Sequence, residues 1–224
     1  MKMNVDFFDN KIYFDIDYIN VIEIENKIYF YRFINSLNNI INNGFSDDII
    51  FFNNDIEKNM NGKIRLFIDY FNLGFDSKKY EKDINKYINE SINEEDKNNL
   101  IIQYNKIIKI YNKILNSIDL PLTVEKEINI DNITKLIKIS IKNKNNLLEN
   151  ILILIDLEQI LKTNSILFFV NLKQYLTNIE LIELYKYAIY NKVKIILIDS
   201  QSYGCTLKYE KKLIIDENLE EYML

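Results

Sequence analysis

The chain has 224 residues, of which 48% are hydrophobic and 27% charged, and its net charge is −5. These values are typical of one large globular domain, or of one domain with an insertion, and they exclude a disordered chain and a uniformly basic nucleic-acid binder. The chain has no histidine, which excludes Ser-His and Cys-His catalysis and histidine ligation of metals.

The first 75 residues alternate between strand-like and helix-like patterns. An apolar, β-branched run at 19–25 predicts a strand. The apolar residues that follow recur at helical spacing, which predicts a helix that ends at Gly44. Two further apolar runs, at 48–52 and 63–69, have the length of strands.

Residues 76–164 then interrupt this pattern with about ninety residues of mainly helical sequence. An amphipathic helix comes first, and a second, more apolar helix is predicted over 97–117, before Pro121 prevents its continuation. A short helix is predicted around 133–137. A long and almost wholly apolar helix follows at 145–162, and we expect it to be buried.

The chain ends in a strand–helix–strand pattern. SILFFVN at 165–171 and VKIILID at 193–199 predict buried strands, and KKLIID at 211–216 predicts a final one. Between the first two, Thr177 and Glu180 have the spacing of a helix capping box. This order implies a parallel crossover.

The two ends of the chain therefore predict one α/β domain. We expect a head with a mostly parallel sheet, formed by residues 1–75 and 165–224, and a long α-helical leg inserted at 76–164. The four glycines lie far apart, so neither common phosphate-binding loop of such folds is present.

Other recognisable signals are also missing from the sequence. One cysteine, Cys205, allows neither an internal disulfide nor a cysteine zinc site. No apolar run reaches the roughly 18 residues of a membrane span, and the first ten residues lack the apolar part of a signal peptide. We therefore expect a soluble, cytoplasmic protein without membrane contact.

Two long segments resemble the Csn-two family, the short-form accessory protein of type II-A CRISPR adaptation. The first, LFIDYFNLGFDSKKYEKDINKYINESINEE, resembles the family's strand, Gly-Phe-Asp turn and first leg helix. The second, ILFFVNLKQYLTNIELIELYKYAIYNKVKIILID, resembles its C-terminal crossover, including the Leu-Thr before the helix. The resemblance covers essentially the whole chain and depends on the order and spacing of these segments.

The resemblance implies a nucleotide-binding-like head without a phosphate loop, and a helical leg. It also implies a ring-shaped homotetramer with a positively charged hole. Such a ring threads onto linear double-stranded DNA from a free end, without sequence preference and without enzymatic activity. Calcium ions order the ring, and the protein acts beside the CRISPR integrase pair and the effector nuclease when new spacers are acquired.

Acidic residues in the leg are the candidate calcium ligands. Calcium takes roughly six to eight oxygen ligands, from carboxylates and carbonyl groups. Four acids lie in or beside the irregular segment after the second leg helix, and one lies on the long apolar helix: Asp119, Glu125, Glu127, Asp131 and Glu149. Ordinary solvated acids are the alternative interpretation.

Lysines at helical spacing are the candidate DNA contacts. One stripe is on the second leg helix, a second follows it, and two basic residues flank a predicted strand: Lys106, Lys109, Lys113, Lys135, Lys138, Lys142, Lys63 and Arg65. A ring would repeat each stripe four times around one hole. The chain has only two arginines, Arg32 and Arg65, so extensive base readout is not expected. Solvated helix faces are the alternative.

Two other functions remain open from the sequence. Asp69 and Asp199 end predicted strands, where a parallel sheet commonly places its functional residues, and with Mg²⁺ they could form a nuclease site. Strand-terminal aspartates also form ordinary turns. The other alternative is a protein-interaction scaffold that does not bind DNA.

Overall fold

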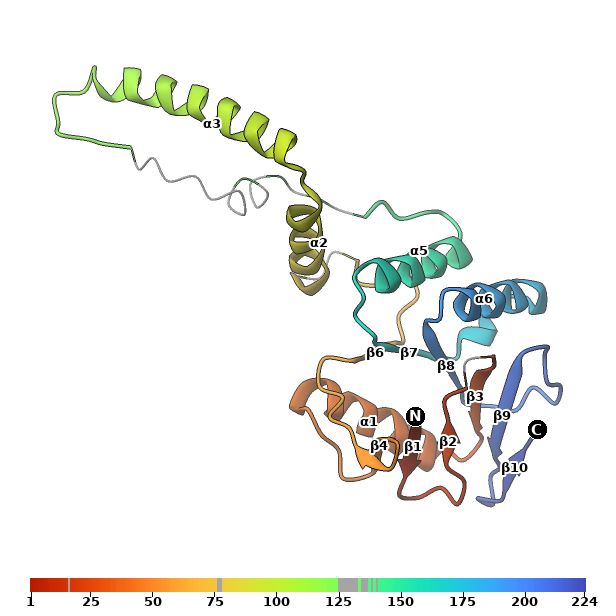
Figure 1. Cartoon of the computed structure of the whole chain (residues 1–224). Coiled ribbons are helices and arrows are strands. Elements are labelled where there is room, and N and C mark those ends of the chain that lie inside the picture. Colours follow the sequence, from red (N-terminus) through yellow and green to blue (C-terminus); the bar gives the residue numbers. More distant parts are fainter. Residues whose placement is uncertain (16, 76–77, 125–132, 134–136, 138, 140) are drawn as a thin grey trace. The chain divides into compact units, whose positions relative to one another are not determined.

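The computed structural model describes all residues except 16, 76–77, 125–132, 134–136, 138 and 140 (Figure 1). By their internal contacts these residues form two compact units. The first comprises Met1–Leu73 and Asn143–Leu224, and the second comprises Gly74–Lys142. Among the described residues, no helix has the length and apolarity needed to cross a membrane.

A six-stranded sheet with the order β10-β9-β3-β8-β7-β6 is the centre of the first unit. Five strands are parallel, and only the edge strand β10 is antiparallel, which confirms the predicted mostly parallel sheet. The strands are β3 (Ile19–Ile24), β6 (Ile64–Phe67), β7 (Ile166–Val170), β8 (Lys194–Asp199), β9 (Glu210–Ile215) and β10 (Glu221–Met223). The central strands are buried along almost their whole length and are mainly apolar, because both faces of the sheet are covered.

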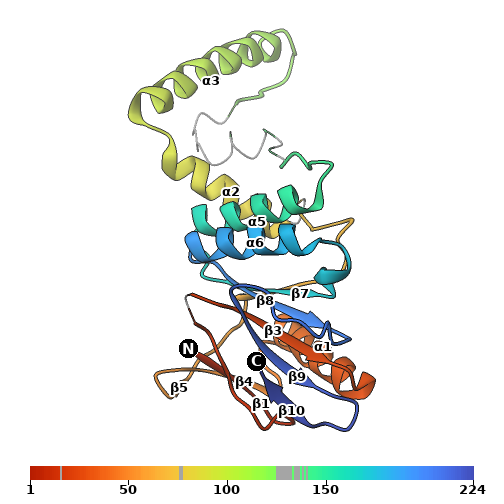
Figure 2. The same ribbon diagram turned by 90° about the vertical axis from the view of Figure 1, so that its right-hand side faces the viewer.

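Helices cover the two faces of this sheet. Helix α1 (Lys27–Asn43) packs on one face, and α5 (Leu147–Ile160) and α6 (Asn178–Tyr190) lie on the other (Figure 2). A short 3-10 helix, η1 (Leu172–Gln174), follows β7. As predicted, α1 ends at Gly44 in a left-handed conformation with φ of 86°, and Thr177 and Glu180 form the capping box of α6.

A second, antiparallel sheet has the order β2-β1-β4-β5. Its strands are β1 (Lys2–Val5), β2 (Ile12–Tyr13), β4 (Ile49–Asn53) and β5 (Ile56–Glu57). Met3 and Phe51 from this sheet share one apolar core with Phe33 and Leu37 of α1. The apolar run at 48–52 correctly predicts β4, but this strand belongs to the antiparallel sheet and not to the mostly parallel one; β1, β2 and β5 were not predicted, because runs this short show no clear alternation.

Helix α5 belongs to the first unit, although its sequence lies within the leg predicted at 76–164. β6 and β7 are neighbouring parallel strands, so the chain between them needs a crossover helix on the sheet, and α5 is that helix. The Arg65 guanidinium lies 2.5 Å from the Glu158 carboxylate, and the Tyr187 hydroxyl donates to Asp156 at 2.5 Å. These contacts join α5 to β6 and α6, so the second boundary falls at residues 142 and 143.

The second unit contains α2 (Lys78–Ser91) and α3 (Glu94–Leu115). The Asn93 side chain caps α3 by accepting from the Asp96 amide, and three acidic residues in the first turn complement the helix dipole. Helix α3 ends at Leu115, before Pro121. The short helix predicted around 133–137 lies largely outside the described residues.

Candidate nucleic-acid interface

Three lysines lie along one side of α3. Lys106, Lys109 and Lys113 are exposed, and their spacing of three and four residues aligns them on a helix. Lys106 donates to the Gln103 side chain at 3.2 Å, and none of the three forms an ion pair with a described carboxylate. Their charges are therefore available to an external anion.

An apolar stripe runs along α3 beside the lysines. Ile107, Ile110, Tyr111 and Ile114 are each between 50% and 60% exposed and follow the spacing of one helix face. With 3.6 residues per turn, this stripe lies roughly a third of a turn from the lysines. Exposed apolar groups that align in this way are typical of interaction surfaces. A partner on the apolar stripe would leave the lysines free.

The other predicted DNA contacts divide into three groups. Lys63 and Lys142 are exposed. Arg65 is not on a free surface, since its side chain is only 10% exposed and its guanidinium pairs with Glu158. Lys135 and Lys138 lie outside the described residues.

Sequence reasoning missed a group of lysines in the first unit. A lysine with positive φ lies two residues after the last residue of both α5 and α6: Lys162 with φ of 50° and Lys192 with φ of 56°. In a parallel sheet every helix-to-strand connection returns to the amino-terminal edge, so both lysines reach the same edge as Lys63. Lys162, Lys192 and Lys194 line one cavity of about 200 Å³. In the sequence, the lysines of LKTNS at 161–165 and NKVK at 191–194, each just before a predicted strand or at its start, were the signal that could have identified this group.

The predicted calcium ligands are only partly described. Asp119 is exposed in the segment after α3. Glu149 is also exposed and lies in the first turn of α5, where its amide donates to the Asn146 side chain at 3.3 Å. Glu125, Glu127 and Asp131 lie outside the described residues. In the part of the chain that the structure describes, no three acidic or cysteine side chains gather closely enough to hold a metal ion.

A buried charge cluster lies on the side of the sheet that α6 covers. It consists of Glu23, Lys173, Asp199, Glu210 and Lys212. The Lys212 ammonium lies 2.8 Å from the Glu23 carboxylate, and the Lys173 ammonium lies 2.9 Å from Glu210 and 3.4 Å from Glu23. These charges compensate one another inside the protein.

Further hydrogen bonds connect the buried charge cluster to neighbouring groups. The Tyr185 hydroxyl donates to Glu210 at 2.7 Å, and the Lys212 ammonium donates to the Cys205 carbonyl at 2.6 Å. Only two residues separate β3 from α1, which is too short a connection for a phosphate loop. The short connection from β3 to α1 agrees with the absence of a phosphate-binding loop from the sequence.

Asp199 is the incompletely satisfied member of the buried charge cluster. It is directly opposite Glu23 in the paired strands, it is fully buried, and neither carboxylate oxygen has a hydrogen-bond partner among the described residues. Asp69, the other strand-terminal aspartate, is exposed and accepts a hydrogen bond from the Phe71 amide in a turn. A hydrated metal ion could reach Asp69 but not Asp199, so this geometry does not favour the nuclease alternative.

We expect Asp199 to make stability depend on pH. Burial raises the pKa of this carboxyl group to about 7, with Lys173 and Lys212 opposing and Glu23 and Glu210 adding to the rise. The folded state then holds a proton that the unfolded state releases near its ordinary value of 3.8, so stability falls as pH rises from about 4 to 7 and levels off above that. The slope from this group is at most about 1.4 kcal/mol per pH unit.

The measurement is urea unfolding from pH 5 to pH 8 of the wild type and Asp199→Asn. The difference between the two proteins isolates this group, because the other titrating residues are common to both. The wild type should lose stability relative to the variant as pH rises to about 7. Parallel pH profiles would contradict the assignment.

The comparisons with known proteins agree with this fold. A family model for CRISPR-associated protein (Cas_Csn2) matches residues 44–219, well over half of the chain. No curated protein matches the chain. The structure is similar to the crystal structure of Stu0660 of Streptococcus thermophilus, with a TM-score of 0.66 and 11% identity over 100% of this chain and 76% of that chain. At 11% identity the similarity to Stu0660 shows the fold alone. The family model shows that the chain belongs to the Cas_Csn2 family of CRISPR-associated proteins.

Proposed function

We propose that this CRISPR-associated protein binds double-stranded DNA without sequence preference, as an end-loaded tetrameric ring in type II-A adaptation. The observation that carries the proposal is the lysine stripe of α3, formed by Lys106, Lys109 and Lys113, which is exposed and forms no ion pair with a described carboxylate. Lysines that contact phosphates bind the DNA backbone whatever the base sequence. The neighbouring leg lysines Lys86 and Lys97 differ, because each lies within 4 Å of a glutamate.

Assembly would use the apolar stripe of α3. A monomer would leave Ile107, Ile110, Tyr111 and Ile114 in water, which is unfavourable for a patch of this kind. Burying the stripe against another copy leaves the lysines exposed beside it. Four copies would then bring twelve such lysines to one DNA segment, enough for the strong salt dependence of backbone binding. A single-subunit mass by light scattering, at micromolar protein with calcium present, would contradict this assembly.

Calcium is proposed as the ion that orders the ring. Asp119, Glu125, Glu127 and Asp131 belong to one acidic segment, and Glu149 is a further candidate. The exposure of Asp119 and Glu149 supports this role, because a hard cation needs carboxylate oxygens that it can reach. Calcium would supply a fixed positive charge that neutralises these acids.

The proposed role is architectural and not enzymatic. The burial of Asp199 in the buried charge cluster supports it, since the second strand-terminal aspartate of a nuclease site is inaccessible. The partners would be the CRISPR integrase pair and the effector nuclease, for which a ring on a DNA end would form a platform.

The testing experiment is a gel shift with one DNA sequence as a linear duplex and as a covalently closed circle, each with calcium and with a chelator. We expect binding to the linear duplex, loss of binding to the circle, and weaker binding in chelator. Equal binding to both forms would leave a basic surface that does not encircle DNA. Binding to neither form would favour the scaffold alternative.

A further inference from the structure

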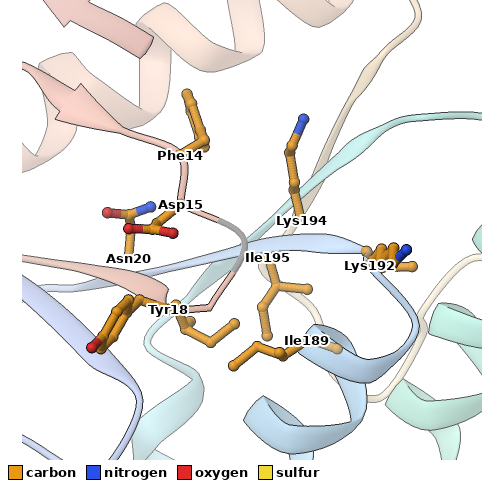
Figure 3. A pocket seen from close by; sticks show the side chains of 11 residues that line it. Phe14, Asp15, Tyr18, Asn20, Ile189, Lys192, Lys194 and Ile195 are labelled. Carbon is orange, nitrogen blue, oxygen red and sulfur yellow. The ribbon is translucent and has the colours of Figure 1, made fainter. Parts of the chain in front are cut away.

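A cavity in the first unit has no part in the proposed DNA binding. It has a volume of about 340 Å³ and lies at the amino-terminal edge of β3 and β8 (Figure 3). Its floor is apolar and well buried, formed by Ile19, Ala188 and Ile195. The volume falls within the range of small-molecule sites in proteins.

One side of this cavity carries flat apolar groups with polar groups beside them. The rings of Phe14 and Tyr18 lie on this side, with Asp15 and Asn20 between them (Figure 3). Tyr18 is 43% exposed and the Lys211 ammonium lies 4.5 Å from its ring centroid, so a ligand can contact the exposed remainder of the side chain. The Asp15 carboxylate pairs with the Lys211 ammonium at 2.6 Å, which neutralises its charge and leaves it a hydrogen-bond acceptor. Such a surface suits a planar heterocycle with an exocyclic amino group.

The opposite side of the cavity is cationic. Lys192 and Lys194 lie across from the aromatic rings, with Ile195 between the two sides (Figure 3). Both lysines also line the adjoining cavity of about 200 Å³, together with Lys162 and the polar residues Thr163 and Ser165. None of these three lysines forms an ion pair with a carboxylate in the described parts of the chain.

The environment of Lys194 favours a bound anion. Lys194 is exposed overall, but partial burial of its ammonium group lowers the pKa of that group, and the like charge of Lys58 lowers it further. The backbone holds Lys192 in place, since its amide donates to the Ile189 carbonyl and the next amide donates to the Ala188 carbonyl, both at 3.0 Å. A phosphate at this position would supply the missing counter-charge through charge-assisted hydrogen bonds.

We propose that these two adjoining cavities bind a mononucleotide, with the base against Phe14 and Tyr18 and the phosphate at Lys192 and Lys194. An apolar slot on one side, and lysines that pair with no described carboxylate on the other, match the two halves of this ligand. The nucleotide can be free or can be the terminal residue of a DNA strand, because both present the same base and phosphate. The site is independent of the proposed DNA binding by α3.

The test is isothermal titration of the full chain with AMP, adenosine and ribose 5-phosphate. AMP should saturate one site per chain, and adenosine and ribose 5-phosphate should each bind at least about tenfold more weakly. Competition then distinguishes the two sources. Displacement of AMP by a 5′-phosphorylated DNA hexamer, but not by the 5′-hydroxyl hexamer, assigns the site to DNA ends, and no displacement by either assigns it to free nucleotides.

Two sets of variants on exposed positions separate the halves of the site. Lys192→Gln with Lys194→Gln should weaken AMP at least about tenfold, and Tyr18→Ala should reduce its affinity toward that of ribose 5-phosphate. The matched control is Lys186→Gln, an exposed lysine of α6 outside both cavities, which should bind AMP as the wild type does.

A third set separates this proposal from the DNA-binding proposal. Charge reversal of the α3 lysines should leave AMP binding unchanged even if it abolishes DNA binding. Equal affinities for AMP and adenosine, full AMP affinity in the double lysine variant, or no saturation by AMP up to about 10 mM would each overturn the site.

Discussion

Replacing Lys212 with methionine should lower the free energy of unfolding by about 3–5 kcal/mol, the usual cost of removing one partner from a buried ion pair. Lys212 is fully buried and contacts both the Glu23 carboxylate and the Cys205 carbonyl. Methionine has a similar length and fills the space, so packing alone changes little. The loss comes from Glu23, which keeps a buried negative charge and the hydrogen bonds from Ser202 and the Tyr203 amide, but whose one remaining cation among the described residues is the more distant Lys173 ammonium. Urea unfolding followed by circular dichroism measures the free energy of unfolding of the variant and of the wild type.

The adjacent residue provides a matched control. Lys211 lies on the same strand and pairs with Asp15 at 2.6 Å, but this pair is partly exposed. Lys211→Met should therefore cost at most about 1 kcal/mol. Equal losses in the two variants would show that the buried charge cluster contributes no more than a surface ion pair.

Reversing the charges of Lys106, Lys109 and Lys113 together should weaken binding to linear DNA by more than about a hundredfold. Each substitution with glutamate removes a phosphate contact and adds repulsion, and a tetramer repeats the change four times. All three side chains are exposed, so α3 should stay folded. Fluorescence anisotropy over a range of salt concentrations is the measurement, and the salt dependence should become shallower than that of the wild type.

A control with the same change in net charge tests whether position matters. Lys27, Lys186 and Lys208 are exposed lysines of the first unit, and their joint substitution by glutamate changes the charge by the same amount. This variant should retain affinity within about fivefold of the wild type. Equal losses in the two triple variants would show that binding depends on overall charge alone and would contradict a DNA surface on α3.

Local patterns predicted most of the regular elements. The strands at β3, β7 and β8 are apolar runs, and α1 and α6 carry their termination and capping signals within a few residues, at Gly44 and at Thr177 with Glu180. These features depend on near neighbours in the chain, so the sequence shows them directly. The lysine stripe of α3 was found for the same reason, because helical spacing fixes which side chains share a face.

The sequence by itself determined the α/β character, the parallel crossover, the helical insertion and the resemblance that the family match confirms. Only the tertiary structure decided that α5 is the crossover helix between β6 and β7, that Arg65 is held by Glu158, and that Lys162, Lys192 and Lys194 meet at one edge. It also decided that Glu23, Asp199 and Lys212 are buried together. The physical reason is that spacing along the chain records local geometry, whereas strand order and burial depend on which distant segments pair.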